Sequence, residues 1–344
     1  MFERDLRRAD RGTERASDGP TSERTAGVNA SQTRVQAGSG QRRETSLEAS
    51  SIASPLSATE RHSGPIRSAA ECLCTGVGQI MFGDKPITGA IFLGGLALAS
   101  PLMAAGAAIG SCIGSVSALA MRCDRTEVKQ GLYGFNAALV GLAMTVAFAP
   151  SMASCALTIG GCAASTAITS AMRRASLSHF TAPFIVSTWA TWAIGKSLEL
   201  NPSQMTNSLL PNVTADPFGA LHGLGQVLFQ ESAVVGGLFV AGLFLSSRKA
   251  AVAGLLGAGV GGAVAAAAGF SSASIASGLL GYNAALCAIA LKDRPAYAAL
   301  ASVVTLPLCA GFGYMGAPAL TAPFVIATWL VSSVMGKSTD KPTS

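Results

Sequence analysis

The chain has 344 residues and a formal net charge of +6; half of its residues are hydrophobic and only 12% are charged. Soluble domains carry roughly 25% charged residues, so this composition excludes an ordinary soluble protein and predicts an all-α membrane protein. The basic residues lie in an N-terminal tail and in short loops, and no basic groove with interleaved aromatic side chains is visible, so no nucleic-acid partner is expected.

Residues 1–66 form a separate class of sequence. They are rich in arginine, acidic residues, serine and threonine, and they contain almost no aromatic side chains. Such a segment cannot bury enough apolar surface to offset the entropy of ordering. We expect a disordered cytoplasmic N-terminal tail. It has no apolar stretch after its charged start, which argues against a secretory signal.

Ten apolar runs follow the tail. A tilted helix needs about 20 apolar residues to cross the hydrocarbon core, so the shorter runs are expected to be broken or to extend into polar flanks. Five runs belong to a first transmembrane repeat, 67–200, at 86–104, 105–121, 131–149, 151–171 and 180–196. Five belong to a second repeat, 218–337, at 233–247, 250–268, 278–291, 296–313 and 320–336. A linker, 201–217, joins the repeats, and a short C-terminal tail, 338–344, follows them.

Three sequence blocks occur once in each repeat and in the same order. The Gly-x-Gly-Gln block at 76–82 returns at 223–229, and the Gly-Leu-x-Gly-aromatic-Asn block at 131–139 returns at 278–286. The Thr-Ala-Pro-Phe block at 181–184 returns at 321–324. Three matches in order indicate an internal duplication, which in membrane transport proteins commonly forms a substrate site near the bilayer midplane.

The loop charges indicate that the two repeats are inverted. Basic loops at 122–129 and 173–174 correspond to uncharged segments of the second repeat, whereas the basic positions of 248–249 and 292–294 correspond to uncharged positions of the first. Five spans per repeat would place equivalent loops on opposite sides, and the positive-inside rule then explains the asymmetry. We expect a multi-pass protein of the cell inner membrane with both termini in the cytoplasm.

Uncharged polar residues recur at equivalent positions of the two repeats. Gln79 and Gln226 lie outside the ten runs, so each is expected in a half-membrane pore helix, which is tolerated only where it lines a cavity or packs on protein. The second and third pairs are Asn136 with Asn283 and Thr181 with Thr321. For the asparagines, a role in the passage and a role in capping a broken helix stay equally open.

Together the six blocks resemble the urea transporter family, over residues 70–337. The resemblance implies a homotrimer in a lipid bilayer, in which two inverted five-helix halves surround a central pore in each protomer. It also implies that urea passes down its gradient without ion coupling. No enzymatic activity, metal or cofactor is implied.

The resemblance also assigns roles to individual residues. Gln79 and Gln226 would accept hydrogen bonds from urea at two outer positions, and Thr181 and Thr321 would line the central constriction. Flat slots that admit a planar solute would be lined by Phe82, Phe135, Leu139, Val227, Phe229, Tyr282 and Leu286. Both outer positions are glutamine, which makes the filter neutral. The hydroxyl of Tyr282, absent from its counterpart Phe135, must reach water or a hydrogen-bond partner.

Four other polar residues have no assigned role. Asp84 aligns with Glu231 directly after the glutamine blocks, where a pore role and a helix-start role are equally plausible; His179 and His222 lack histidine counterparts and are interpreted as interfacial residues. Ionisable residues are almost absent from the apolar runs, which disfavours a coupled small-solute transporter. That alternative stays open, as does a channel of the same fold for another small neutral amide or for ammonia.

Overall fold

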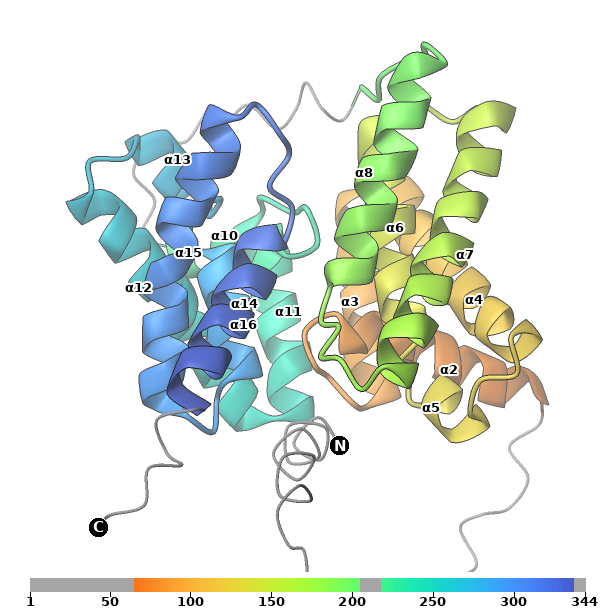
Figure 1. Ribbon diagram of the computed structural model, residues 1–344, viewed down its shortest axis with the longest axis horizontal. Coiled ribbons are helices and arrows are strands. Elements are labelled where there is room, and N and C mark those ends of the chain that lie inside the picture. The colour runs from red at the N-terminus through yellow and green to blue at the C-terminus, as the bar shows by residue number, and fades with distance from the viewer. Residues whose placement is uncertain (1–64, 205–217, 337–344) are drawn as a thin grey trace, which may run out of the picture. The chain divides into compact units, whose positions relative to one another are not determined.

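The computed structural model describes residues 65–204 and 218–336, and the structural statements below concern these residues (Figure 1). Fourteen helices account for their regular structure, apart from one antiparallel bridge between Phe148 and Pro202, so the expected all-α fold is confirmed. Nearly all of the predicted tail 1–66, most of the linker 201–217 and the whole of 338–344 lie outside the described residues.

The helices form two sets of seven. The first set comprises α2 (Pro65–Gln79), α3 (Pro86–Ala99), α4 (Pro101–Ala120), α5 (Arg125–Lys129), α6 (Gly134–Ala147), α7 (Met152–Arg174) and α8 (Ala182–Ser197). The second comprises α10 (Gly219–Gln226), α11 (Ala233–Ser246), α12 (Arg248–Ala267), α13 (Ser272–Ala276), α14 (Tyr282–Ala290), α15 (Pro295–Tyr314) and α16 (Ala322–Gly336). Helices α3, α4 and α5 recur as α11, α12 and α13 with the same lengths, so the sequence duplication is also a structural one.

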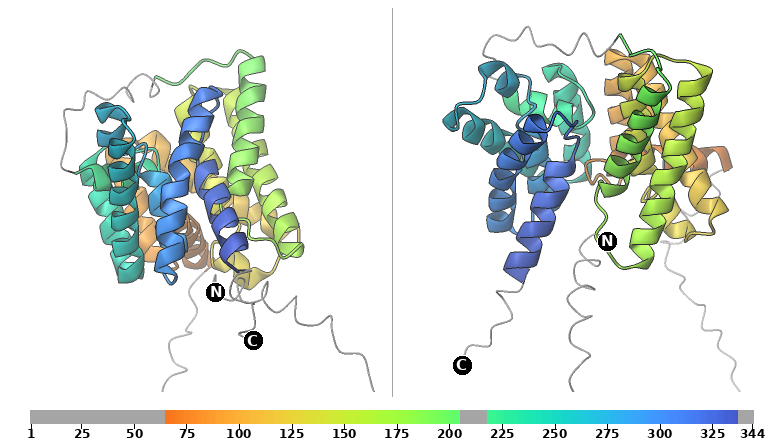
Figure 2. Two further views of the ribbon diagram at one scale, coloured as in Figure 1. Left: turned by 60° about the vertical axis from the view of Figure 1, so that its left-hand side comes forward. Right: turned by 45° about the horizontal axis from the view of Figure 1, so that its top comes forward.

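The two sets repeat the same packing. Helix α4 packs on α6 as α12 packs on α14, α2 packs on α3 as α10 packs on α11, and α7 packs on α8 as α15 packs on α16. The sets meet where α3 contacts α11, and there the rings of Phe92 and Phe239 lie 5.1 Å apart at an interplanar angle of 61°. The right-hand view in Figure 2 shows the two sets as separate groups of helices.

Equivalent helices run in opposite directions. In Figure 1, the chain ascends through α8 and descends through α16, and it likewise descends through α7 and ascends through α15. This is the geometry expected when the second repeat is turned over relative to the first.

Glycine lets the central helices approach closely. All residues of α6 from Gly134 to Met144 are buried, and in α14 all residues from Asn283 to Ala290 are. A Cβ added at Gly110 of α4 would lie 2.3 Å from the Ala137 carbonyl oxygen of α6. Small residues at such contacts are the usual means by which helices pack in lipid, so the glycine content needs no functional explanation.

Four helices are long and apolar enough to cross a membrane, namely α4, α7, α12 and α15. The apolar helices α3, α6, α11 and α16 are shorter, with 10–17 residues each. Between 22% and 44% of the residues in the long helices' most apolar windows are buried, so most of that apolar surface faces outward. The predicted total of ten spans stays a prediction.

The predicted boundary between the first two apolar runs, 86–104 and 105–121, is wrong. A single run was expected to continue to 104, but α3 ends at Ala99 and α4 begins at Pro101. Between them, the Ser100 hydroxyl accepts a hydrogen bond from the Met103 N–H at 3.3 Å, and Pro101 occupies the first helical turn, where its missing N–H is tolerated. Hydropathy alone could not detect this break, because Ser100 is the only polar residue there.

Candidate functional site

Gln79 and Gln226 are the last residues of the equivalent helices α2 and α10. After each glutamine the chain makes the same turn, in which the Phe82 N–H donates to the Gln79 carbonyl at 3.0 Å and the Phe229 N–H donates to the Gln226 carbonyl at 3.0 Å. Phe82 (φ 61°) and Phe229 (φ 58°) adopt the left-handed conformation that usually favours glycine. The two phenylalanines therefore occupy equivalent strained positions three residues beyond the glutamines.

The side-chain amide of each glutamine is anchored by its nitrogen. The Gln79 Nε2 group donates to the Gln130 carbonyl at 3.1 Å, and the Gln226 Nε2 group donates to the Ser277 carbonyl at 3.0 Å. Gln130 and Ser277 are themselves equivalent positions, each directly before a left-handed glycine. Among the described residues, no hydrogen bond reaches the Oε1 atom of Gln79 or Gln226, so each amide presents an acceptor.

Three further acceptors lie beside Gln79. The backbone carbonyls of Ile80 and Met81 accept no hydrogen bond from the residues that the structure describes. The Oε1 atom of Gln130 is buried and likewise has no partner there. An unpaired buried acceptor costs free energy unless a ligand or water satisfies it. Gln130 was not predicted from the sequence. Its counterpart in the second repeat, Ser277, is not an amide, so no recurring amide marked the position.

Thr181 and Thr321 meet directly. They precede α8 and α16, both are buried, and their hydroxyl oxygens are 2.7 Å apart, within hydrogen-bonding distance. The residues before them, Phe180 (φ 42°) and Leu320 (φ 46°), are again equivalent and left-handed. A hydrogen bond of this length leaves no space between the two hydroxyls, so any solute must pass beside the pair. The structure does not bring Gln79 into contact with Gln226.

The two asparagines cap the helices that begin at these threonines. Asn136 accepts from the Phe184 N–H at 3.2 Å and donates to the Phe180 carbonyl at 3.2 Å.

Asn283 accepts from the Phe324 N–H at 3.1 Å and donates to the Leu320 carbonyl at 3.3 Å. Of the two alternatives left open by the sequence, the structure therefore supports capping, which satisfies N–H groups at the start of each helix.

Aromatic rings from the repeated blocks and from Phe180, the residue before Thr181, pack against one another. The Phe324 ring lies 6.4 Å from Phe82 and 5.4 Å from Phe180, in edge-to-face geometry both times. Phe324 is fully buried. Although it closes the repeated Thr-Ala-Pro-Phe block, the sequence analysis gave it no role. The block's periodic recurrence was a signal that could have identified it.

The remaining predicted slot residues lie in or next to the central helices. Leu139 of α6, Leu286 of α14 and Val227 directly after α10 are buried. Phe135 packs beside the His179 ring at 5.9 Å. The hydroxyl of Tyr282 donates to the Leu320 carbonyl, so it reaches a protein partner rather than open solvent.

The aligned carboxylates differ in environment. Asp84 is exposed and accepts a hydrogen bond from the Ser246 hydroxyl at 2.7 Å, which ties it to the end of α11. Glu231 lies 3.5 Å from the Gln226 Nε2 atom, and partial burial raises the pKa of its carboxyl. The His222 Nδ1 atom contacts the Glu231 backbone carbonyl. Only the second-repeat carboxylate therefore lies beside a glutamine.

A charged cluster around Glu127 in the first repeat has no counterpart at the equivalent positions of the second. Glu127 accepts hydrogen bonds from the Tyr133 hydroxyl at 2.9 Å and the Arg173 Nε group at 3.1 Å. Burial and the nearby Arg173 guanidinium lower the pKa of His179 to about 4. His179 is therefore neutral near pH 7. Across residues 65–204 and 218–336, no three His, Cys, Asp or Glu side chains are arranged to hold a metal ion.

Comparison with known proteins adds a family. A family model described as urea transporter matches residues 70–336. Urea transporter 1 of Ovis aries is 29% identical over 292 residues, an alignment that covers 74% of this chain and 74% of the relative. Urea transporter 1 of Rattus norvegicus is 30% identical over 293 residues, with the same coverage of both chains.

Proposed function

This chain belongs to the urea transporter family, and we propose that it conducts urea passively through a passage lined by neutral amide and carbonyl groups. Family membership and the apolar helices make it a membrane protein of a transporter family rather than of an enzyme family. The channel mechanism and the residues that form the filter are the proposal.

The paired glutamines carry the proposal. Urea is neutral and planar and donates several N–H groups, so a filter must supply acceptors that replace its hydration water. The anchored amides of Gln79 and Gln226 each leave one Oε1 acceptor, and the free carbonyls of Ile80 and Met81 extend the acceptor row beside Gln79. Preorganised acceptors cost no rearrangement when the solute arrives.

The neutrality of the helices argues against ion coupling. Helices α3, α4, α6, α11, α14, α15 and α16 contain no Asp, Glu, Lys or Arg. Intramembrane carboxylates and basic groups are the usual means of binding a proton or a sodium ion during transport. Helices without such groups suit a neutral solute that moves down its own gradient.

The opposite directions of α8 and α16 support the inverted arrangement (Figure 1). In this arrangement Gln79 and Gln226 lie at opposite ends of one passage, and Thr181 and Thr321 lie at its middle. The slot residues would be Phe82, Phe135, Leu139, Val227, Phe229, Tyr282 and Leu286, with Phe324 beside them. We further propose a homotrimer in the inner membrane with cytoplasmic termini.

Substituting either glutamine tests the filter. Gln79→Leu and Gln226→Leu keep the side-chain size but remove the acceptor, so urea flux into proteoliposomes should fall by about tenfold each, as expected for an unmet N–H group. The matched control is Gln204→Leu, at an exposed glutamine after α8, which should conduct like the parent chain. Flux within twofold of the parent for both filter variants, at equal amounts of monodisperse protein, would contradict the assignment.

A further inference from the structure

Basic side chains gather where α12 and α15 begin. Arg248 and Lys249 open α12, and Lys292 and Arg294 directly precede α15. The one carboxylate among them, Asp293, forms ion pairs with Lys249 and with Lys292, the latter at 3.7 Å, and its hydrogen bond to Lys249 keeps its pKa low. Four basic residues and one ionised carboxylate in these two segments leave an excess of positive charge.

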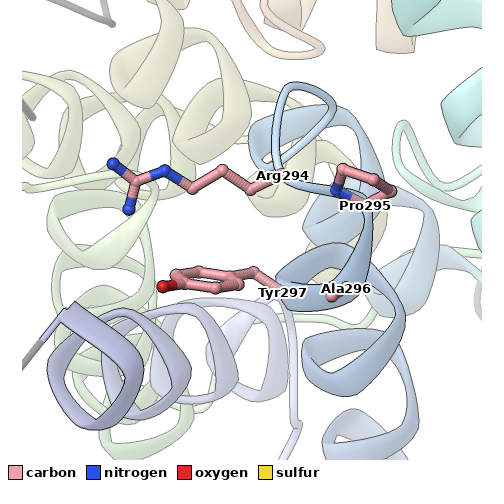
Figure 3. Close-up of a pocket in the computed structure, with 4 residues that line it drawn as sticks. All are labelled: Arg294, Pro295, Ala296 and Tyr297. Carbon is pink, nitrogen blue, oxygen red and sulfur yellow. The ribbon is translucent and has the colours of Figure 1, made fainter. Parts of the chain in front are cut away.

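An open pocket lies beside this group. It has a volume of about 430 Å³ and is lined by Arg294, Pro295, Ala296 and Tyr297. Figure 3 shows the Arg294 guanidinium and the Tyr297 ring projecting in the same direction from the start of α15, one above the other. The guanidinium carbon lies 5.3 Å from the ring centroid, a cation–π distance. The Asp293 carboxylate forms its ion pairs with the two lysines. Within the described residues, no ion pair therefore neutralises the charge of Arg294.

An apolar stripe continues from the pocket along α15. Ala296, Leu300 and Val303 lie three or four residues apart, on one face of the helix, and all three are exposed. Helix α15 is also the least buried of the four helices long enough to cross a membrane. In a bilayer this stripe meets acyl chains, and the pocket at its end lies at headgroup depth, where tyrosine rings and arginine side chains are commonly found.

We propose that the pocket binds the headgroup of an anionic phospholipid. The phosphate accepts hydrogen bonds from the Arg294 guanidinium, whose planar donors match phosphate geometry. The Tyr297 ring supports the guanidinium, the neighbouring lysines add long-range attraction, and an acyl chain covers Leu300 and Val303. The proposal rests on the membrane placement given above and does not depend on which solute permeates.

A lipid titration of the full-length protein in neutral detergent tests this site. Dioctanoyl phosphatidylglycerol should raise the melting temperature in a saturable, salt-sensitive way, whereas dioctanoyl phosphatidylcholine should not. Arg294→Gln should weaken the apparent affinity about tenfold, as loss of charged hydrogen bonds predicts. Tyr297→Leu should weaken it about threefold, the effect of an exposed cation–π contact.

Three controls separate the alternatives. Arg125→Gln removes an exposed arginine of α5 and should leave the affinity unchanged; equal weakening would mean diffuse attraction and overturn the site. Glycerophosphoglycerol, the deacylated headgroup of phosphatidylglycerol, carries the same phosphodiester without acyl chains, and equal binding would overturn the lipid assignment. A change of oligomeric state in Arg294→Gln would show a contact between copies of the chain instead.

Urea flux is measured separately, in phosphatidylcholine liposomes, where Arg294→Gln should equal the parent chain. A parent chain without urea flux would contradict the proposed function while leaving the lipid titration valid. A lipid titration without effect would contradict the site while leaving the channel intact.

Discussion

At the residue scale, the loops around the proposed passage hold bulky side chains in left-handed backbone. Phe82, Phe229, Phe180 and Leu320 form two equivalent pairs with φ between 42° and 61°. Each costs roughly 1–2 kcal/mol relative to ordinary backbone. The hydrogen bonds that maintain them, from helix-end turns and from the two asparagines, are repeated in both halves. This shared strain is consistent with a shared function of the loops.

Equivalent positions were predictable where the repeat reports them, and the roles of these residues stay predictions. The glutamine and threonine pairs were identified from recurrence, and the structure anchors both glutamine amides to equivalent backbone carbonyls and brings the two threonines into contact. Gln130 and the Glu127 cluster occur in one half only, so recurrence could not report them. Sequence spacing also could not distinguish capping from pore lining for Asn136, because both place an amide at the same position.

His179 predicts a pH dependence of stability. Its pKa is lowered to about 4 in the folded chain, against about 6.5 in an unfolded one. The unfolded state therefore binds more protons between these values, and stability should fall as pH drops from about 6.5 to 4. The melting temperature of the parent should decline more steeply over that interval than that of His179→Gln. Parallel declines would contradict the neutral, packed histidine.

At the element scale, close approach of α2 and α3 positions Gln79. A Cβ built at Gly89 of α3 would lie 1.7 Å from the Cys74 carbonyl oxygen of α2, and one built at the equivalent Gly236 of α11 would lie 2.1 Å from the Leu221 carbonyl oxygen of α10. Composition could not indicate which glycines make these contacts, because apolar faces lie both inward and toward lipid.

Two alanine substitutions in α3 test whether the contact between α2 and α3 positions Gln79. Gly89→Ala should force α3 away from α2, cost about 1–3 kcal/mol of stability and reduce urea flux by displacing Gln79. Gly94→Ala, on the same helix, meets nothing within 4 Å and should be neutral or slightly stabilising. Melting temperatures and flux of the two variants check this. Equal behaviour would mean that the contact does not position the glutamine.

At the scale of the whole molecule, the order of the helices, their pairings and the opposite directions of equivalent helices all follow from the duplication seen in the sequence. Loop charges predicted the inversion because basic residues are enriched in the loops on the cytoplasmic side of a membrane. Helix lengths were less predictable: α14, with 9 residues, is much shorter than the run expected for it. Because α14 is buried against α12, α15 and α16, it does not have to extend to both membrane surfaces.

The central claim is passive conduction of urea by the whole chain. Stopped-flow shrinkage and reswelling of proteoliposomes under an inward urea gradient measures it directly. We expect urea uptake far above that of empty liposomes, unchanged by removal of sodium or by a proton gradient, because α3, α4, α6, α11, α14, α15 and α16 contain no Asp, Glu, Lys or Arg that could couple to either ion. Urea uptake equal to that of empty liposomes, or uptake that requires sodium or a proton gradient, would contradict the account.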